Sequence, residues 1–383
     1  MIGSATEPSP IARAVAVVPP PGITVPARTG VPVILRLTEA EALGASMRVG
    51  GLRVVDRALR QLARQRDARV IIATDGSVSL PRRLPPNIER RKLDGDVATG
   101  LAALEDELGA ETTSVGADTV WLQPWRFEEG IRVVDAASRR AAGDAVFGEL
   151  QRDAVGIVDR VVNHKLSALL TRLLLANLPV TPALLTLAAG FVGIYGALMV
   201  ATGTSPNVVI GFAVLQGYIV LDGSAALLAR ARLHQSGLGA WLDTLIGDFV
   251  NVVLILAVGR ALWAHGGTFL DMKMAAVGAA ATLLYALLTY RELVRQGQGD
   301  VANLRWWFAH WQSLRTFSGA GSHSIKAVTL LGRRDFIIAL ALGLAVLDQL
   351  PVVLLVLLIV AISRAGGALV QLFARDWRVR PQA

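Results

Sequence analysis

The 383-residue chain has no cysteine, which excludes disulfide bonds, thiolate metal sites and cysteine nucleophiles. Its net charge of +8 and mean hydropathy of +0.50 favour a membrane surface or anionic substrates as partners. No nucleic acid partner is expected, because no basic stretch is interleaved with aromatic side chains that could stack on bases. Residues 1–30 are rich in Pro and Ala and predict a flexible leader rather than a signal peptide.

Residues 31–152 read as a soluble domain. Val31–Leu35 and Ala68–Ala73 are predicted to be buried strands, and the apolar spacing of Leu52–Ala63 predicts a helix between them. This strand, helix, strand order indicates a parallel α/β sheet. Further along, we expect a strand over Thr119–Leu122 and a helix over Arg132–Glu149.

The second half is much more apolar. Residues 153–179 form an amphipathic segment, which predicts a helix lying in the membrane interface; a helix packed on the neighbouring domain is the alternative. Residues 180–378 then contain six apolar runs of a length that suits transmembrane helices. The six predicted spans are Thr181–Thr202, Asn207–Leu228, Ala240–Ala264, Met274–Tyr290, Asp335–Leu350 and Val352–Leu372.

The distribution of cations predicts the orientation of these spans. The connections after the second and fourth spans, and the segment after the sixth, are rich in Arg, whereas the alternate connections hold little beyond Lys273. Positively charged loops stay in the cytoplasm. We therefore expect a multi-pass protein of the cell (inner) membrane, with both termini and the soluble domain on the cytoplasmic side.

Three acidic residues fall inside or at the start of apolar runs. These are Asp222 in the second run, and Asp243 and Asp248 at the start of the third. Carboxylates in membrane spans are costly and usually functional. The alternative is that they cap helices or form ion pairs with Arg230 and Arg232.

The sequence around these acids resembles the signature of the CDP-alcohol phosphotransferase (phosphatidyltransferase) family, D-x2-D-G-x2-A-R-x8-G-x3-D-x3-D. Ala229-Arg230, Gly239 and Asp243 have the family's spacing, and Asp222 takes the position of the first aspartate. Two positions depart from the pattern, since Ala225 replaces the second aspartate and Gly247 the fourth. A second register, with Asp222-Gly223 as the Asp-Gly pair, would need three extra residues before Ala229.

The resemblance implies an integral membrane transferase that moves a phosphatidyl or phosphoalkyl group from a CDP-linked donor to an acceptor alcohol and releases CMP. It implies Mg²⁺ or Mn²⁺ as cofactor, held by Asp222 and Asp243, with membrane lipid as a further partner and a homodimer as the usual assembly. Arg230, Ala229 and Gly239 would line the donor site. In the family the fourth aspartate is the base, so Asp248, beside Gly247, is the candidate here.

Two alternatives remain open. An inactive relative of the family would bind lipid or nucleotide, or act as a scaffold, without transferring any group. A transporter would account for six spans, although it would not account for the spacing from Ala229-Arg230 to Asp243.

Two segments outside the signature add to the resemblance. Thr181-Pro182 is similar to the family's entry into its first span, where substrate binds. Arg333-Arg334-Asp335 is similar to the segment before the fifth span in members fused to a nucleotidyltransferase domain; an ordinary positive flank is the alternative reading.

The soluble domain is similar to sugar-phosphate nucleotidyltransferases over Val49–Leu59, where a glycine turn leads into a helix. The Gly-rich, Arg-containing nucleotide loop of those enzymes is missing from Arg36–Gly44. We therefore predict a nucleotidyltransferase-like fold that lacks this activity. Asp94, Asp96 and Asp118 are candidate metal ligands in it, with turn and cap roles as the favoured alternative.

Overall fold

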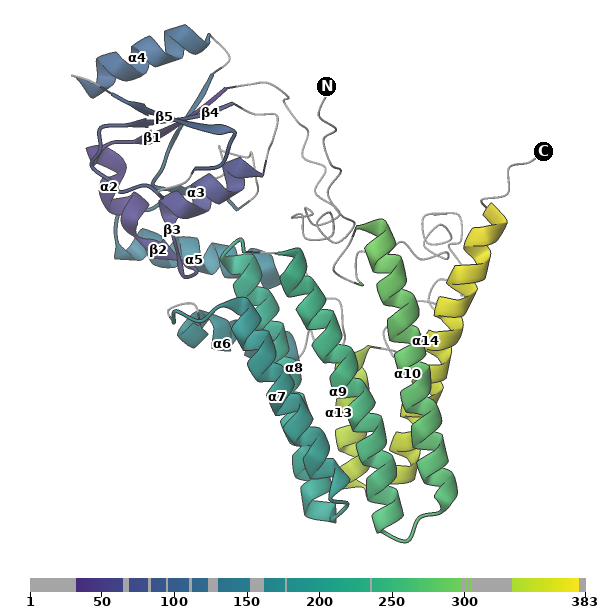
Figure 1. Ribbon diagram of the computed structural model, residues 1–383. Coiled ribbons are helices and arrows are strands. Elements are labelled where there is room, and N and C mark those ends of the chain that lie inside the picture. The colour runs from purple at the N-terminus through teal and green to yellow at the C-terminus, as the bar shows by residue number, and fades with distance from the viewer. Residues whose placement is uncertain are drawn as a thin grey trace, which may run out of the picture.

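A computed structural model shows an α/β domain at one end of a long helical bundle (Figure 1). The predicted leader, residues 153–161 of the predicted interfacial segment, and Asp94 with Gly95 lie outside the described residues. The structure describes residues 32–64, 69–81, 84–93, 96–109, 112–122, 130–151, 162–175, 178–234, 236–297, 301, 304 and 333–378.

The centre of the amino-terminal domain is a four-stranded parallel sheet. Its strands are β1 (Val33–Leu37), β4 (Val70–Thr74), β5 (Ile88–Lys92) and β6 (Thr113–Gly116), in the order β5-β4-β1-β6. All three pairings are parallel. The predicted parallel α/β sheet is therefore confirmed.

Helices cover both faces of this sheet. Alternate residues of a strand point to opposite faces, so Leu35 packs in one apolar cluster and Ile34 in another. The first cluster includes helix α3 (Val54–Ala63) and the second includes α4 (Val97–Leu108). The domain is thus a three-layer sandwich around two apolar cores.

Two helices begin later in the chain than predicted, because a short strand takes up the first residues of each predicted helix. Leu52–Arg53 form strand β3, which pairs with β2 (Arg48–Val49) across a turn at Gly50 and Gly51, both with positive φ. Ile131–Arg132 form β8, which pairs with β7 (Thr119–Val120). Helix α3 consequently begins at Val54 rather than Leu52, and α5 (Ala136–Gln151) begins after Arg132.

Within the described part of the chain, five helices of the bundle are long and apolar enough to cross a membrane. Large apolar side chains such as Phe191 and Leu287 are exposed along their outer faces, as is typical of lipid contact. The chain is therefore a membrane protein by length and composition of its helices. The five helices are α7 (Pro182–Ala201), α8 (Ser205–Ala231), α9 (Gly237–Ala264), α10 (Phe269–Gln296) and α14 (Leu350–Arg378).

The predicted span over Asp335–Leu350 corresponds to α13 (Arg334–Val346), which has only 13 residues. A helix of that length extends about 20 Å, less than the hydrocarbon core of about 30 Å. It packs beside α8 and α14 in the bundle (Figure 1). Five of the six predicted spans are thus present as long apolar helices, and the count of six stays a prediction, as does the cytoplasmic orientation.

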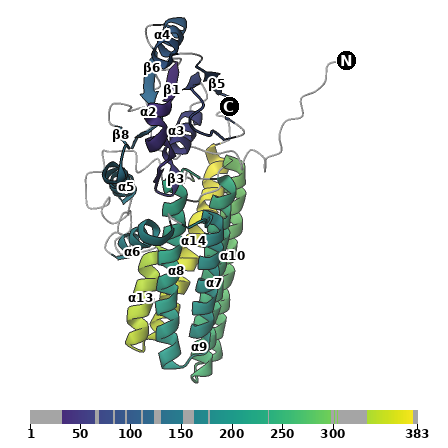
Figure 2. The same cartoon turned by 90° about the vertical axis from the view of Figure 1, so that its left-hand side faces the viewer.

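The segment before the first span contains a short α6 (His164–Leu170) that continues into π-helical turns over Thr171–Leu175. It projects from the side of α8, near the end of the bundle that bears the α/β domain (Figure 2). The Ser167 hydroxyl fixes it by donating to the Val220 carbonyl of α8 at 2.8 Å. Leu166 and Leu169 remain exposed, an arrangement that suits the predicted interfacial helix.

The α/β domain is attached to the carboxyl end of α8. Arg57 of α3 donates to the carbonyl of Ala231, and Arg60 donates to the carbonyl of Arg232 at 2.8 Å. Phe147 of α5 packs against Ala231. These contacts satisfy carbonyl groups that a helix end leaves without partners inside the helix.

Candidate functional site

The three acidic residues of the apolar runs lie on α8 and α9, near the connection between these two helices. Asp222 is in the last part of α8, while Asp243 and Asp248 are in the first part of α9. Because α8 and α9 are joined by a short connection, their adjacent ends bring the acids to the same level of the bundle. The predicted helix–loop–helix arrangement therefore concentrates negative charge in one region.

Asp222 and Asp243 face each other. Their carboxyl groups are close enough to interact directly. Arg334 is a cation beside both acids: its Nη1 lies 3.8 Å from Oδ2 of Asp222, and its charge also acts on Asp243. The same guanidinium donates to the hydroxyl of Tyr218, one turn before Asp222 on α8. Two carboxylates, one guanidinium and one phenol thus form a compact polar group in which Tyr218 is buried, Asp222 is partly buried and Asp243 is exposed.

Arg334 reaches this group because α13 begins there. It is the first residue of α13, after the amino-terminal cap at Arg333. Arg333 itself bonds to the Asp335 carboxylate, with its Nε 3.1 Å from Oδ1. The amino-terminal end of a helix carries a partial positive charge. The start of α13 therefore adds positive potential next to Asp222 and Asp243.

Asp248 lies on another side of α9. It is buried, with 9% of its surface exposed, and its Oδ2 accepts a hydrogen bond of 2.8 Å from the Tyr290 hydroxyl of α10. The Tyr290 ring packs edge-on against Trp241. Five residues along a helix turn the side chain by about 140° relative to Asp243. The candidate base is thus held by α10, and the charge of Arg334 acts on it as well as on Asp222 and Asp243.

Replacing Tyr290 by Phe should lower the free energy of unfolding by about 1–3 kcal/mol, because the buried Asp248 carboxylate loses its hydroxyl donor. Thermal unfolding of the purified protein in detergent would measure this effect. Tyr195→Phe is the matched control, since Tyr195 is exposed on α7. Equal melting temperatures for the two variants would contradict the assigned role of Tyr290.

A second arginine lies near this region. Arg364 of α14 stacks over the ring of Tyr285, with its Cζ 5.9 Å from the ring centroid. It lines a cavity of about 30 Å³ together with Arg334, Asn251 and Thr282. A cavity of this size has room for water rather than for a substrate.

The residues predicted to bind substrate lie at the same end of the bundle, in several local roles. Ala229 and Arg230 form part of the last turn of α8. The Gly239 N–H is bonded to the Ser236 hydroxyl that caps α9, at 3.0 Å. Thr181 caps α7 by accepting from the N–H of Leu184. Pro182 follows as the first residue of α7, where its missing N–H costs nothing.

The two departures from the signature have distinct environments. Ala225 is 2% exposed and packs with Leu185 and Leu228 in an apolar cluster. Gly247 is buried beside the guanidinium of Arg334. Ala225 therefore belongs to a small apolar core, whereas the missing side chain of Gly247 leaves space for the guanidinium of Arg334.

The geometry of the acidic residues limits the kind of metal site that they can form. Among the residues that the structure describes, no three His, Cys, Asp or Glu side chains converge on one metal site. Asp222 and Asp243 alone supply facing carboxylate oxygens, which are the donors that Mg²⁺ and Mn²⁺ prefer. This donor set fits one divalent cation, with the remaining ligands coming from substrate or water.

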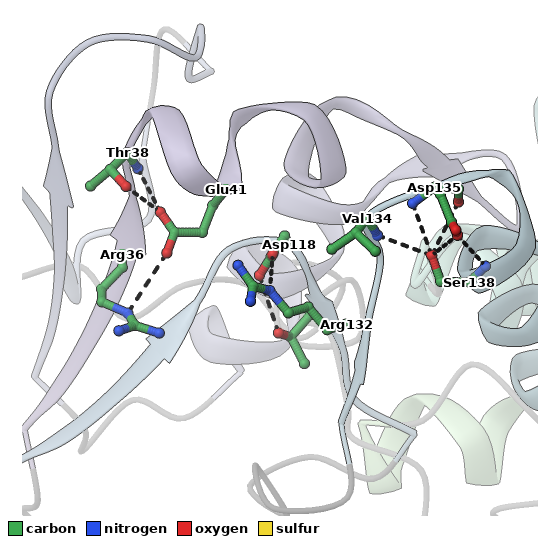
Figure 3. Close-up of polar contacts among 9 residues, drawn as sticks. Arg36, Thr38, Glu41, Asp118, Arg132, Val134, Asp135 and Ser138 are labelled. Carbon is green, nitrogen blue, oxygen red and sulfur yellow. Dashed lines mark hydrogen bonds and ion pairs between the residues drawn. The ribbon is translucent and has the colours of Figure 1, made fainter.

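The α/β domain has its own polar edge at the carboxyl ends of β1 and β6 (Figure 3). Glu41 accepts hydrogen bonds from the backbone N–H and the hydroxyl of Thr38. Asp118 is buried and accepts from Nε of Arg132 at 2.7 Å. Asp96 caps α4 by accepting from Thr99. Asp96 and Asp118 thus have cap and ion-pair partners, in agreement with the favoured alternative to metal binding.

Three site residues were not predicted as such from the sequence: Tyr218, Tyr290 and Arg334. Tyr218 carries a signal, since it precedes Asp222 by one helical turn and so shares its face. The sequence signal for Arg334 is weaker: it is a charged residue at the start of an apolar run. Tyr290 has none, because only the packing of α10 on α9 brings it to Asp248.

No family model matches the chain, and a comparison with known proteins finds a distant relative. The chain is similar to the bifunctional IPC transferase and DIPP synthase of Aquifex aeolicus (strain VF5), with 24% identity over 204 residues. The match covers 53% of this chain and 44% of that protein, so each is aligned over about half its length. The overall sequence similarity, which does not depend on the signature spacing alone, therefore points to an enzyme. The name of that relative describes both a transferase and a synthase.

Proposed function

We propose that the chain is a membrane transferase that moves a phosphoalkyl or phosphatidyl group from a CDP-linked donor to an acceptor alcohol. The observation that carries the proposal is the meeting of Asp222 and Asp243 beside Arg334 within a bundle of apolar helices. Charged groups at such a position are costly to keep unless they serve a function. The signature spacing and the similarity to a named transferase support the same activity.

In the proposed reaction, the hydroxyl oxygen of the acceptor attacks the donor phosphorus that carries the alcohol. A new P–O bond forms as the bond from that phosphorus to the CMP oxygen breaks, and CMP leaves with the electron pair. Asp248 is the proposed acceptor of the hydroxyl proton, and its hydrogen bond from Tyr290 fixes the orientation of the carboxylate.

The chain's cations would stabilise the phosphate charge. Arg334 is held among the acids, and Arg230 in the last turn of α8 would contact the donor diphosphate. Ala229 and Gly239 carry no bulk that would block the approach of the diphosphate, and Thr181-Pro182 set the start of α7 next to it. A single Mg²⁺ or Mn²⁺ held by Asp222 and Asp243 would supply further positive charge to the diphosphate oxygens.

CMP release tests the proposal. The full chain in lipid vesicles would receive CDP-diacylglycerol or a CDP-polyol, Mg²⁺ or Mn²⁺, and a panel of acceptors that includes inositol phosphate and glycerol phosphate. Acceptor-dependent CMP release that EDTA abolishes is the expected result. No release with any combination would reject the transferase, and binding of the same donors without turnover would favour an inactive relative that binds lipid or nucleotide.

A further inference from the structure

The guanidinium of Arg334 occupies the space directly over Gly247. A Cβ atom built on Gly247 would lie 2.1 Å from Nη2 and 2.7 Å from Cζ of Arg334. Atoms cannot approach this closely, so any residue with a side chain at position 247 would displace the guanidinium. The absence of a side chain at Gly247 and the position of Arg334 are therefore two parts of one arrangement.

The surroundings of Arg334 are acidic on several sides. Its charge acts on Asp222, Asp243 and Asp248, and the Tyr218 ring lies under it with Cζ 5.9 Å from the centroid. The facing carboxyl groups of Asp222 and Asp243 repel each other when both are charged, and partial removal from water strengthens that repulsion. A cation at this position offsets the repulsion.

We infer that Arg334 is the resident cation of the acidic site and takes the place of a further divalent ion. An arginine side chain is always charged and cannot dissociate from the chain as a metal ion can. Its planar guanidinium also matches two oxygens of one phosphate group. The site accordingly holds about one exchangeable divalent ion, between Asp222 and Asp243. Its other cationic group is the guanidinium of Arg334, which is part of the chain and cannot exchange.

The inference deepens the proposed function but can be measured without it. The full chain in detergent would be titrated with Mn²⁺, and free Mn²⁺ would be followed by electron paramagnetic resonance. We expect about one Mn²⁺ per chain in the wild type. Arg334→Met should bind a further Mn²⁺ or bind the first about tenfold more tightly, because a neighbouring positive charge is removed. Adding Asp222→Asn to this variant should abolish the gain.

A second variant keeps the test decisive where Arg334→Met fails to fold. Gly247→Ala leaves every charge in the chain and forces only the guanidinium to move, so it should raise Mn²⁺ binding in the same direction. Gly343→Ala is the matched control, because a Cβ on this α13 glycine would meet no other atom within 4 Å. Its Mn²⁺ binding should equal that of the wild type.

Two results would overturn the inference: two tightly bound Mn²⁺ ions in the wild type, or unchanged Mn²⁺ binding in both Arg334→Met and Gly247→Ala. Failure of the proposed function looks different. In that case no variant would release CMP, while the Mn²⁺ titrations would still show whether Arg334 excludes a divalent ion. Conversely, CMP release by a wild type that binds two ions would support the transferase and reject the role of Arg334.

Discussion

CMP release by Asp222→Asn is expected to fall about 100-fold or more below that of the wild type. The substitution keeps the size of the side chain but removes the carboxylate that faces Asp243 and pairs with Arg334. Both the proposed divalent ion and the guanidinium would lose a ligand or partner. Initial rates of CMP release at saturating donor, with Mn²⁺ varied, would measure the loss.

Asp243→Asn should show a loss of similar size, and the double variant should be little worse than either single one. Residues that act as one unit give effects that do not add. Asp348→Asn is the matched control, because Asp348 lies in the turn between α13 and α14 with φ of 57°, a conformation that Asn tolerates well. An activity of Asp222→Asn within about twofold of this control would remove Asp222 from the proposed site.

The pairing of Asp222 with Asp243 was open to prediction because it depends on local chain geometry. Both residues belong to consecutive apolar helices joined by a short loop, and the signature spacing fixes their positions relative to that loop. The position of Arg334 was not predictable in the same way. It depends on where α13 starts inside the bundle, which is set by packing between helices more than 100 positions apart.

The short length of α13 arises at its carboxyl end. The helix begins at Arg334, one residue before the predicted start, but it ends at Val346, just before a turn in which Asp348 has φ of 57°. Hydropathy measures how apolar a segment is and contains no information on where a turn interrupts an apolar run.

The α/β domain shows which local sequence signals are sufficient to predict a strand or a helix. Strands β1 and β4 and helix α3 follow from apolar spacing alone. Helix α2 (Glu39–Ser46) falls in the stretch that was compared with a nucleotide loop, yet its start is encoded by Thr38 and Glu41. A Thr followed three residues later by Glu is a recognised helix start. The sequence therefore contains a local signal for the start of α2.

Arg57→Met is expected to loosen the α/β domain from the bundle, lowering the free energy of unfolding by about 2–3 kcal/mol. Arg57 is 3% exposed and donates to the carbonyls of Val49 and Ala231, so both buried carbonyls would lose a charged donor. Burial, with the charge of Arg60 as the second cause, lowers the pKa of Arg57 to about 10. The lowered pKa shows that burying the charge of Arg57 costs free energy. Arg57→Met removes this cost together with the hydrogen bonds, so the net decrease in the free energy of unfolding is moderate.

Hydrogen exchange of the amides in the last turn of α8 would locate the effect, and thermal unfolding would give its size. Arg53→Met is the matched control, because Arg53 is partly exposed and its bonds to Asp56 and Ser79 stay within the α/β domain. Faster exchange at Ala231 and Arg232 in Arg57→Met alone is the expected pattern. Equal exchange in both variants would mean that the contact with Ala231 does not hold the domain in place.

The location of this contact gives the α/β domain a mechanical role in the proposed transferase. The backbone carbonyl of Ala231 lies one residue after Arg230, and the guanidinium of Arg232 donates to the carbonyls of Val180 and Leu178 just before Thr181. Arg57 and Arg60 therefore fix the turn that carries Arg230 and, through Arg232, the start of α7. If Arg57→Met weakens donor binding as measured by the KM for CDP-diacylglycerol, while Arg53→Met does not, then the domain supports the site through helix α8 without taking part in the chemistry.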